Sequence, residues 1–298
     1  MRVWAAQQNR LESLDVLRGL AIFCMIFVDA VPDPDRAPSW MLHTSWQGIS
    51  FADLAFPGFV FAMGAAMAVW LDRRSGRRQG AATGKIWRRT MALILLGLLY
   101  NSLPLLFQYL LFPETASLSL WEEFSQHGRW LGVLQRLALV YAAGMMLGGR
   151  LRSDFRILLA AFLLLAAGWS WSQLDMVSKP LWTAPYALYT SGVLMLLAAL
   201  VQLLFLCVPR AASFVFHPMR VFGMNALFIY MATGVALSLL WLLPSSAEGQ
   251  PFFSWLWSVS VGSMFPEADS IVCFALLWCV CWWPLMELLY RRRIFIKL

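Results

Sequence analysis

Long apolar runs separated by short polar segments dominate the pattern of this chain. A transmembrane helix needs about 20 predominantly apolar residues, because each residue advances it by about 1.5 Å through a hydrocarbon core of about 30 Å. Eight stretches meet that requirement. We therefore predict an all-α polytopic membrane protein, a bundle of about eight transmembrane helices, at residues 14–30, 50–71, 88–111, 131–149, 155–172, 185–208, 220–243 and 270–290.

Basic residues gather in every second polar segment between these stretches. Residues 72–89 alone hold seven Lys or Arg side chains, and the segments on the same side of the bundle hold 18 in total. The other side holds only Arg36, Arg129 and Lys179. Because Lys and Arg are enriched in cytoplasmic loops, we predict that the basic side and both termini are cytoplasmic.

The composition excludes a soluble domain and gives little support to binding of nucleic acid or metal. Hydrophobic residues make up 60% of the chain and charged residues 13%, with a mean hydropathy of +0.66. Topology and anionic lipid headgroups explain the net charge of +7, so we expect a bilayer and no nucleic acid. All five cysteines fall in apolar stretches without the paired spacing of a zinc site, so no metal is expected.

A few ionisable residues stand out at the predicted outer end. A carboxylate inside hydrocarbon costs roughly 2.5 to 3.5 kcal/mol on insertion scales, so Asp53 is a functional-site hypothesis. Asp29 ends the first stretch, and His43 lies on the loop between the two. Arg136 lies about 7 Å below the outer boundary at the helical rise. We expect these four residues to converge, with an ion pair between Arg136 and one aspartate as the alternative reading.

Two local patterns have simpler consequences. Pro57 has no backbone N–H, so the carbonyl oxygen of Asp53 loses its usual helical donor. We predict a kink or a free backbone acceptor beside the acid. Asp15 and Arg18 are three residues apart on one helical face, where each can neutralise the other.

Several motifs, in order along nearly the whole chain, together resemble one known family, the heparan-α-glucosaminide N-acetyltransferases and their bacterial relatives. The motifs are Arg10-Leu-x-Ser-Leu-Asp-x-x-Arg18-Gly19, His43-x-x-Trp46-x-Gly48, Asp53-Leu54-x-x-Pro57-x-Phe59-x-Phe61-x-x-Gly64, Gly132-Val133-Leu134-Gln135-Arg136, Lys179-Pro180-Leu181-Trp182-Thr183 with Leu188-Tyr189-Thr190, Gly223-Met224-Asn225, and the basic tail from Tyr290 to Lys297.

The resemblance implies a single integral-membrane acyltransferase domain over residues 1–298. Such an enzyme takes acetyl from cytosolic acetyl-CoA and delivers it across the membrane to the amine of a glucosamine-type sugar. His43 matches the catalytic histidine of the family, and it can act as a general base or carry the acetyl group itself. Asp29 and Asp53 are the other catalytic candidates, and Trp46 and Asp29 are candidates for binding the acceptor.

This chain departs from the family in two respects. It has Asp29 where the family usually has asparagine, which favours a cationic amino sugar or an imidazolium at His43. We also expect it to do without the large lumenal domain of the lysosomal enzyme. A free amino sugar or a cell-wall fragment is therefore the expected acceptor, and a bacterial inner membrane the expected location.

Cations and polar side chains are the candidates for binding the donor. Phosphate recognition favours Arg and Lys groupings, and several such residues lie toward the cytoplasmic face. Gln135 and Asn225 are candidates to line the path of the pantetheine arm, although hydrogen bonds between helices explain them equally well. The basic candidates are Arg18, Arg88, Arg89, Arg136, Arg292 and Lys297.

The residues alone leave other functions open. A proton-coupled transporter can use Asp29, Asp53 and Arg136 as a relay. A structural membrane protein without chemistry is a third reading. The oligomeric state also stays open, and a homo-oligomer is compatible with the sequence.

Overall fold

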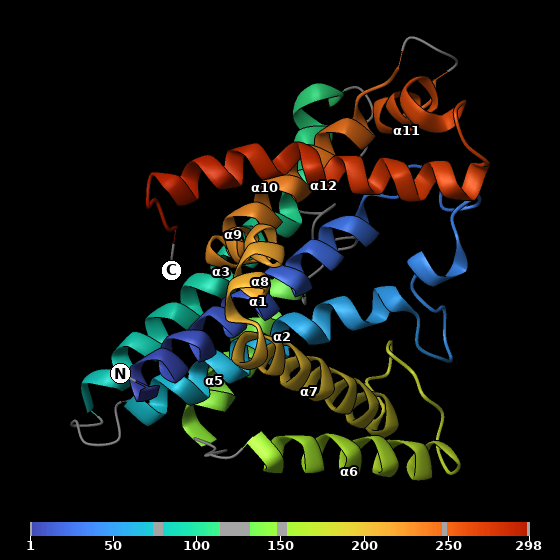
Figure 1. The fold of residues 1–298 in the computed structure, drawn as a ribbon. Helices are drawn as coiled ribbons and strands as arrows, with labels where there is room; N and C mark the ends of the chain where they lie inside the picture. The colour runs from blue at the N-terminus through green and yellow to red at the C-terminus, as the bar shows by residue number, and fades with distance from the viewer. Residues whose placement is uncertain (1, 74–79, 114–131, 148–153, 246–248, 297–298) are drawn as a thin grey trace.

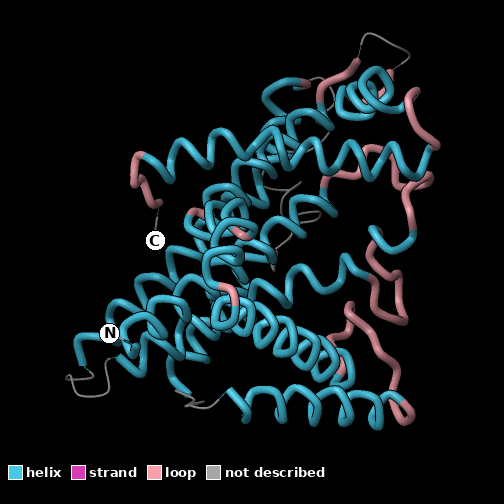
Figure 2. The backbone as a smooth tube through the Cα atoms, viewed as in Figure 1, coloured by secondary structure: helices cyan, strands magenta, loops and turns pink. Residues whose placement is uncertain are grey.

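Helices account for almost all of the computed structural model, which describes residues 2–73, 80–113, 132–147, 154–245 and 249–296 (Figures 1 and 2). In these ranges β pairing is limited to an isolated bridge between Pro244 and Pro251. The all-α prediction is confirmed. The helices are α1 (Arg2–Asp29), η1 (Ser39–Met41), α2 (Phe51–Arg73), α3 (Gly80–Leu111), α5 (Val133–Leu147), α6 (Asp154–Ser172), α7 (Ala184–Cys207), α8 (Pro209–Val215), α9 (His217–Met224), α10 (Ala226–Leu242), α11 (Phe252–Trp257), η3 (Ser258–Gly262) and α12 (Glu267–Arg291).

Each of the eight apolar stretches forms helix within the described part of the chain. By length and composition three of the helices can cross a membrane, and the bent pair α9 and α10 makes a fourth if it counts as one span. Other apolar helices are shorter, for example Phe51–Met67 and Val133–Ala142. The chain therefore has the character of a helical membrane protein, and the count of eight spans stays a prediction. The three long apolar helices are Ile86–Leu111, Ala184–Cys207 and Glu267–Arg291.

One predicted element is wrong in shape. The stretch 220–243 was expected to be one continuous span, but α9 and α10 meet at Asn225 with a bend of 84°. The side-chain amide of Asn225 supplies a reason, because it binds the backbone after α12. It donates to the carbonyl oxygen of Ile294 at 3.0 Å and accepts from the amide of Ile296 at 2.9 Å.

Helices α1 and α9 approach each other closely at a pair of glycines. A Cβ atom on Gly19 would overlap the backbone carbonyl oxygen of Met219, and one on Gly223 would overlap that of Asp15. Small residues allow such a backbone approach between helices. The bend after α9 therefore places this short helix directly against α1.

Buried apolar side chains of α1, α9, α10, α11 and α12 form the largest core cluster, which includes Ile22, Ile26, Phe222, Ile229, Phe253, Ile271 and Phe274. Helix α6 packs on α7 at the edge of the molecule (Figure 1). Both termini lie at one end of the view, at the left, and the α1–α2 and α6–α7 loops lie at the other (Figure 1). The candidate site lies between those two loops.

Candidate active site

The first turn of α2 orients the carboxylate of Asp53. Ser50 precedes the helix, and Asp53 is its third residue. Both the backbone amide and the hydroxyl of Ser50 donate to Oδ2 of Asp53, each at 3.0 Å. An acid at this position that accepts the amide of the capping residue forms half of a capping box, and the helix dipole favours a negative charge there.

Thr44 completes the set of donors around Oδ2 of Asp53. Its hydroxyl donates at 2.8 Å and its backbone amide at 3.3 Å. The side chain of Asp53 is fully buried. With Oδ2 surrounded by the donors of Thr44 and Ser50, the other oxygen, Oδ1, faces the basic groups of the site.

Three atoms form a triangle at Oδ1 of Asp53. Nδ1 of His43 lies 3.1 Å from this oxygen, and Nζ of Lys179 lies 3.0 Å from it. The distance between Nζ of Lys179 and Nδ1 of His43 is 2.9 Å. The imidazole is half exposed, with 53% of its side-chain surface accessible, whereas Lys179 is 19% accessible. The site is therefore an open imidazole on top of a buried ion pair, which we call the His43–Asp53–Lys179 cluster.

The α6–α7 loop brings Lys179 to this cluster from far along the chain. The backbone amide of Gly48 donates to the carbonyl oxygen of Val177 at 2.8 Å, which joins the two loops. Trp182 follows with a positive φ of 52° and packs edge-on against Phe56 of α2 and Tyr186 of α7. These contacts fix the loop on α2 beside the acid.

A second link connects α7 to the backbone of the acid. The hydroxyl of Tyr186 donates to the carbonyl oxygen of Asp53 at 2.8 Å. Because Pro57 cannot supply the helical donor, this oxygen is available to a side chain. Of the predicted kink or free backbone acceptor beside Asp53, the structure shows a backbone acceptor that is not free, because Tyr186 donates to it.

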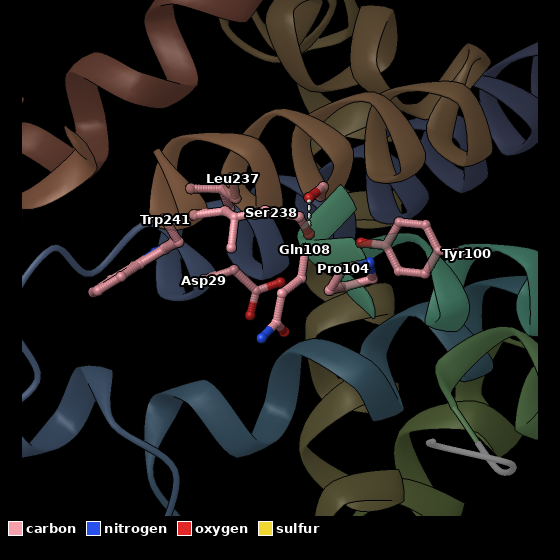
Figure 3. Close-up of a pocket in the computed structure, with 9 residues that line it drawn as sticks. Asp29, Tyr100, Pro104, Gln108, Leu237, Ser238 and Trp241 are labelled. Atoms are coloured by element: carbon pink, nitrogen blue, oxygen red, sulfur yellow. Dashed lines mark hydrogen bonds between the residues drawn. The ribbon is translucent and has the colours of Figure 1, made fainter. Parts of the chain in front are cut away.

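Asp29 lines a separate pocket of about 510 Å³ between the end of α1, α3 and α10 (Figure 3). Its carboxylate lies next to the amide of Gln108, and Trp241 lies at one edge of the group (Figure 3). An acid, an amide, hydroxyls and an aromatic ring suit a polar ligand that carries a positive charge. The lining consists of Asp29, Tyr100, Pro104, Gln108, Gly234, Leu237, Ser238, Trp241 and Leu242, so neither His43 nor Asp53 borders this pocket.

The expected convergence of four residues is only partly observed. His43 and Asp53 are in contact, whereas Arg136 is exposed near the start of α5. Within the described ranges no ion pair joins Arg136 to an aspartate, so the alternative of a helix-locking pair finds no support there. Trp46 is 53% exposed, three residues after His43.

The candidate donor-binding residues lie in different environments. Arg18 is half-buried and donates to Oδ1 of Asp15 at 3.2 Å and to the carbonyl oxygen of Gly223 at 3.3 Å. Gln135 is buried, and neither amide atom has a hydrogen-bond partner in the described structure. Asn225 binds the segment after α12, and Lys297 lies outside the described residues. The exposed cations among these candidates are Arg88, Arg89, Arg136 and Arg292.

Sequence reasoning missed Lys179 as a site residue. It counted this lysine as an outer-side charge and as part of a motif, and 136 residues separate it from His43. The motif Lys179-Pro180 on an outer loop was the available signal. The spacing Ser50-x-x-Asp53 also matches a capping box and would have placed the acid in the first turn of a helix.

Comparisons with known proteins agree with the motifs. A family described as a domain of unknown function (DUF5009) matches residues 10–100, a range that includes His43 and Asp53. Heparan-alpha-glucosaminide N-acetyltransferase of Mus musculus is 36% identical over 138 residues, 45% of this chain and 18% of the mouse protein. The protein of that name from Homo sapiens is 34% identical over 142 residues, 46% of this chain and 19% of the human protein. The chain spans about a fifth of the length of these curated relatives and is similar to them over nearly half of its own, which confirms the resemblance to the heparan-α-glucosaminide N-acetyltransferases.

Proposed function

We propose that this chain is a transmembrane N-acetyltransferase that moves acetyl from cytosolic acetyl-CoA to the amine of a glucosamine-type sugar on the periplasmic side. The observation that carries the proposal is the His43–Asp53–Lys179 cluster, an exposed imidazole held by a buried carboxylate. Both His43 and Asp53 lie in the range 10–100 that matches the domain of unknown function DUF5009. The similarity to N-acetyltransferases supports the reaction class.

His43 can serve the reaction by two routes. As a general base, a neutral imidazole takes a proton from the amine while the amine nitrogen attacks the thioester carbonyl. As a carrier, the imidazole itself attacks first and forms an acetyl-imidazole that the amine then opens. In both routes the C–S bond breaks and the C–N bond of the amide forms. In the base route the imidazole passes the amine proton to the thiolate of CoA; in the carrier route the thiolate takes the ring N–H proton of the acetyl-imidazolium, and the amine then gives its proton to the imidazole. An acceptor that binds as an ammonium first loses one proton to solvent, because only the free amine has a lone pair.

The donor is proposed to bind at the basic, cytoplasmic end of an eight-span bundle formed by a single domain over residues 1–298. The position of both termini at the end opposite the α1–α2 loop supports this sidedness (Figure 1). The cations Arg88, Arg89 and Arg292 are exposed and available to phosphates. Gln135, with a buried amide that lacks partners in the described structure, is the candidate to meet the pantetheine arm.

The acceptor is proposed to be a free amino sugar or a cell-wall fragment that carries its amine as an ammonium. Asp29, in a pocket with an aromatic wall and several polar groups, supports a cationic sugar. Trp46 is exposed, three residues after His43 in the chain, and is suited to stack on a sugar ring. A bacterial inner membrane is the proposed location.

Reconstituted vesicles test the proposal. Vesicles are loaded with glucosamine, acetyl-CoA is added outside, and the lumenal product is identified by mass spectrometry. We expect N-acetylglucosamine with the wild type and at least about a 100-fold lower rate with His43→Ala. The matched control is His217→Ala, because His217 binds Glu287 away from this cluster.

Two outcomes would overturn the proposal. Full activity of His43→Ala would remove the assigned role of the imidazole. Uptake of unmodified sugar that needs a proton gradient and no acetyl-CoA would instead support the transporter with Asp29, Asp53 and Arg136.

A further inference from the structure

The reacting amine needs a binding surface next to the His43–Asp53–Lys179 cluster. The pocket that contains Asp29 borders neither His43 nor Asp53, so a sugar held only in that pocket does not bring its amine to the imidazole. Trp182 is an aromatic residue that is 40% exposed, and its ring is held by the same segments that build the cluster.

A tight turn joins Trp182 to the lysine of the cluster. The backbone amide of Trp182 donates to the carbonyl oxygen of Lys179 at 3.1 Å, and Pro180 occupies the second position of the turn, where proline is favoured. The flanking residues close the turn with two further bonds. The amide of Thr183 donates to the carbonyl oxygen of Ser178 at 3.2 Å, and the amide of Ser178 donates to Oγ1 of Thr183 at 3.0 Å. Lys179 and Trp182 are thus the two ends of one fixed turn.

The indole of Trp182 packs on two residues that lie next to Asp53 or bind it. Its ring centroid lies 5.8 Å from that of Phe56 and 5.9 Å from that of Tyr186. Phe56 follows Asp53 by three residues on one face of α2, and the hydroxyl of Tyr186 donates to the carbonyl oxygen of Asp53. Both rings stand nearly perpendicular to the indole, at 75° and 74°, so neither is stacked flat on it. The indole therefore lies beside the cluster and keeps accessible surface.

The backbone of Trp182 adopts a conformation that favours glycine. Its φ of 52° lies in the left-handed region, where a bulky residue is a rare outlier. Glycine fits the end of a turn without this cost. Strained positions persist where the surrounding structure fixes them, and they cluster at ligand-binding sites. A tryptophan at this position indicates a use for its side chain.

The surroundings of the indole suit a sugar better than an acyl chain. The side chain of His43 is 53% accessible and that of Lys179 is 19% accessible. An acyl chain laid over the indole would remove water from these polar groups without replacing its hydrogen bonds. A sugar ring offers an apolar C–H face to an aromatic ring and hydroxyls to polar neighbours, and ligand sites combine aromatic walls with a few polar groups in this way.

We propose that Trp182 is a specificity-determining residue of the acceptor site: its exposed indole is the platform on which the ring of an amino sugar lies while the amine faces His43. The inference deepens the proposed function and rests on it for the identity of the sugar. Lys179 and Trp182 then act from one turn, with the lysine bound to Asp53 and the tryptophan in contact with the acceptor.

A fluorine label on tryptophan tests the platform in the wild-type chain. The purified full-length chain carries fluorotryptophan, and fluorine NMR in detergent follows the indoles while glucosamine is added without acetyl-CoA. The chain has 16 tryptophans, so the resonance of Trp182 is assigned by its loss in Trp182→Phe. We expect this resonance to shift with glucosamine until the shift saturates.

A second tryptophan and two variants supply the controls. Trp171 is 50% exposed at the end of α6, and its resonance, assigned with Trp171→Phe, should not move. Trp182→Gly removes the ring and adopts the positive φ freely, so KM for glucosamine should rise at least about fivefold with a smaller change in kcat. Trp182→Phe keeps a flat ring, and its KM should stay closer to that of the wild type.

A Trp182 resonance that does not respond to glucosamine would overturn the proposal. A resonance that instead follows the acyl-chain length of added lipid would also overturn it and identify the indole as an interfacial anchor. The NMR readout needs no acetyl transfer, so a saturable shift in a chain that forms no acetylated sugar would support the platform while the proposed function fails. Acetylated sugar formed by a chain whose Trp182 resonance does not move would do the reverse.

Discussion

The hydroxyl of Tyr186 donates to the backbone carbonyl oxygen of Asp53 at 2.8 Å, in the one place where Pro57 removes the donor that a helix would supply. The carbonyl oxygen that the proline leaves without a helical donor thus has a donor on a neighbouring helix. The bond joins α7 to the first turn of α2, the turn that holds the acid of the candidate site.

Removal of this hydroxyl should destabilise the fold measurably. Tyr186→Phe leaves a buried carbonyl oxygen without a donor, which costs about 1–3 kcal/mol of unfolding free energy. Unfolding in detergent mixtures measures the change. A Pro57→Ala background supplies the matched control, because alanine returns the backbone N–H, and Tyr186→Phe should cost less there. Equal costs in the two backgrounds would contradict the pairing.

Neutralising the buried acid should reduce activity while leaving the imidazole in place. Asp53→Asn removes the charge that pairs with Lys179 and replaces one of the two acceptor oxygens of the side chain with an NH2 donor. We expect the acetyl-transfer rate to fall by about 100-fold or more, measured as N-acetylglucosamine formed per vesicle. Asp33→Asn is the control, since Asp33 pairs with Arg36 on the surface. Wild-type turnover in Asp53→Asn would exclude a part for this carboxylate.

A methyl group at the crossing of α1 and α9 should separate these helices. Gly19→Ala places a Cβ atom on the carbonyl oxygen of Met219, and overpacking of this kind typically costs about 1–3 kcal/mol. Gly84→Ala in α3 is the matched helical control, because its Cβ meets open space. That variant should gain about 0.5–1 kcal/mol from helix propensity. Similar thermal stabilities for both variants would argue against the close crossing.

The charge of Asp29 should determine how well a cationic acceptor binds. Asp29→Asn keeps the size of the side chain and removes its charge, so KM for glucosamine should rise about tenfold, equal to about 1.4 kcal/mol of binding. Ser238→Ala tests the same pocket without a change in charge and should alter KM much less. Steady-state kinetics at low salt are the measurement. An unchanged KM for Asp29→Asn would place the acceptor elsewhere.

The sequence predicted the helices and part of the site for physical reasons that can be named. Apolar runs of sufficient length form helix regardless of their partners, and a proline has the same effect on its helix in any fold. The contact between His43 and Asp53 follows from a loop that returns to the adjacent helix. The position of Lys179 beside Asp53 depends on how α7 packs beside α2, and a single sequence contains no direct record of that packing.

The bend between α9 and α10 was not predictable for a related reason. Asn225 sits inside an apolar run where a polar amide is compatible with a straight helix. Its partners are the backbone groups of Ile294 and Ile296, about 70 residues later. The choice between a straight and a bent helix therefore depends on a contact across the chain.

The two hydrogen bonds between Asn225 and the segment after α12 couple the mobility of that segment to the bend between α9 and α10. A spin label or fluorophore attached near residue 295 would sit beside a joint in the middle of the chain. Any motion that straightened α9 and α10 into one continuous helix would have to break these hydrogen bonds. The mobility of a label in the segment would therefore report when the bend straightens and re-forms.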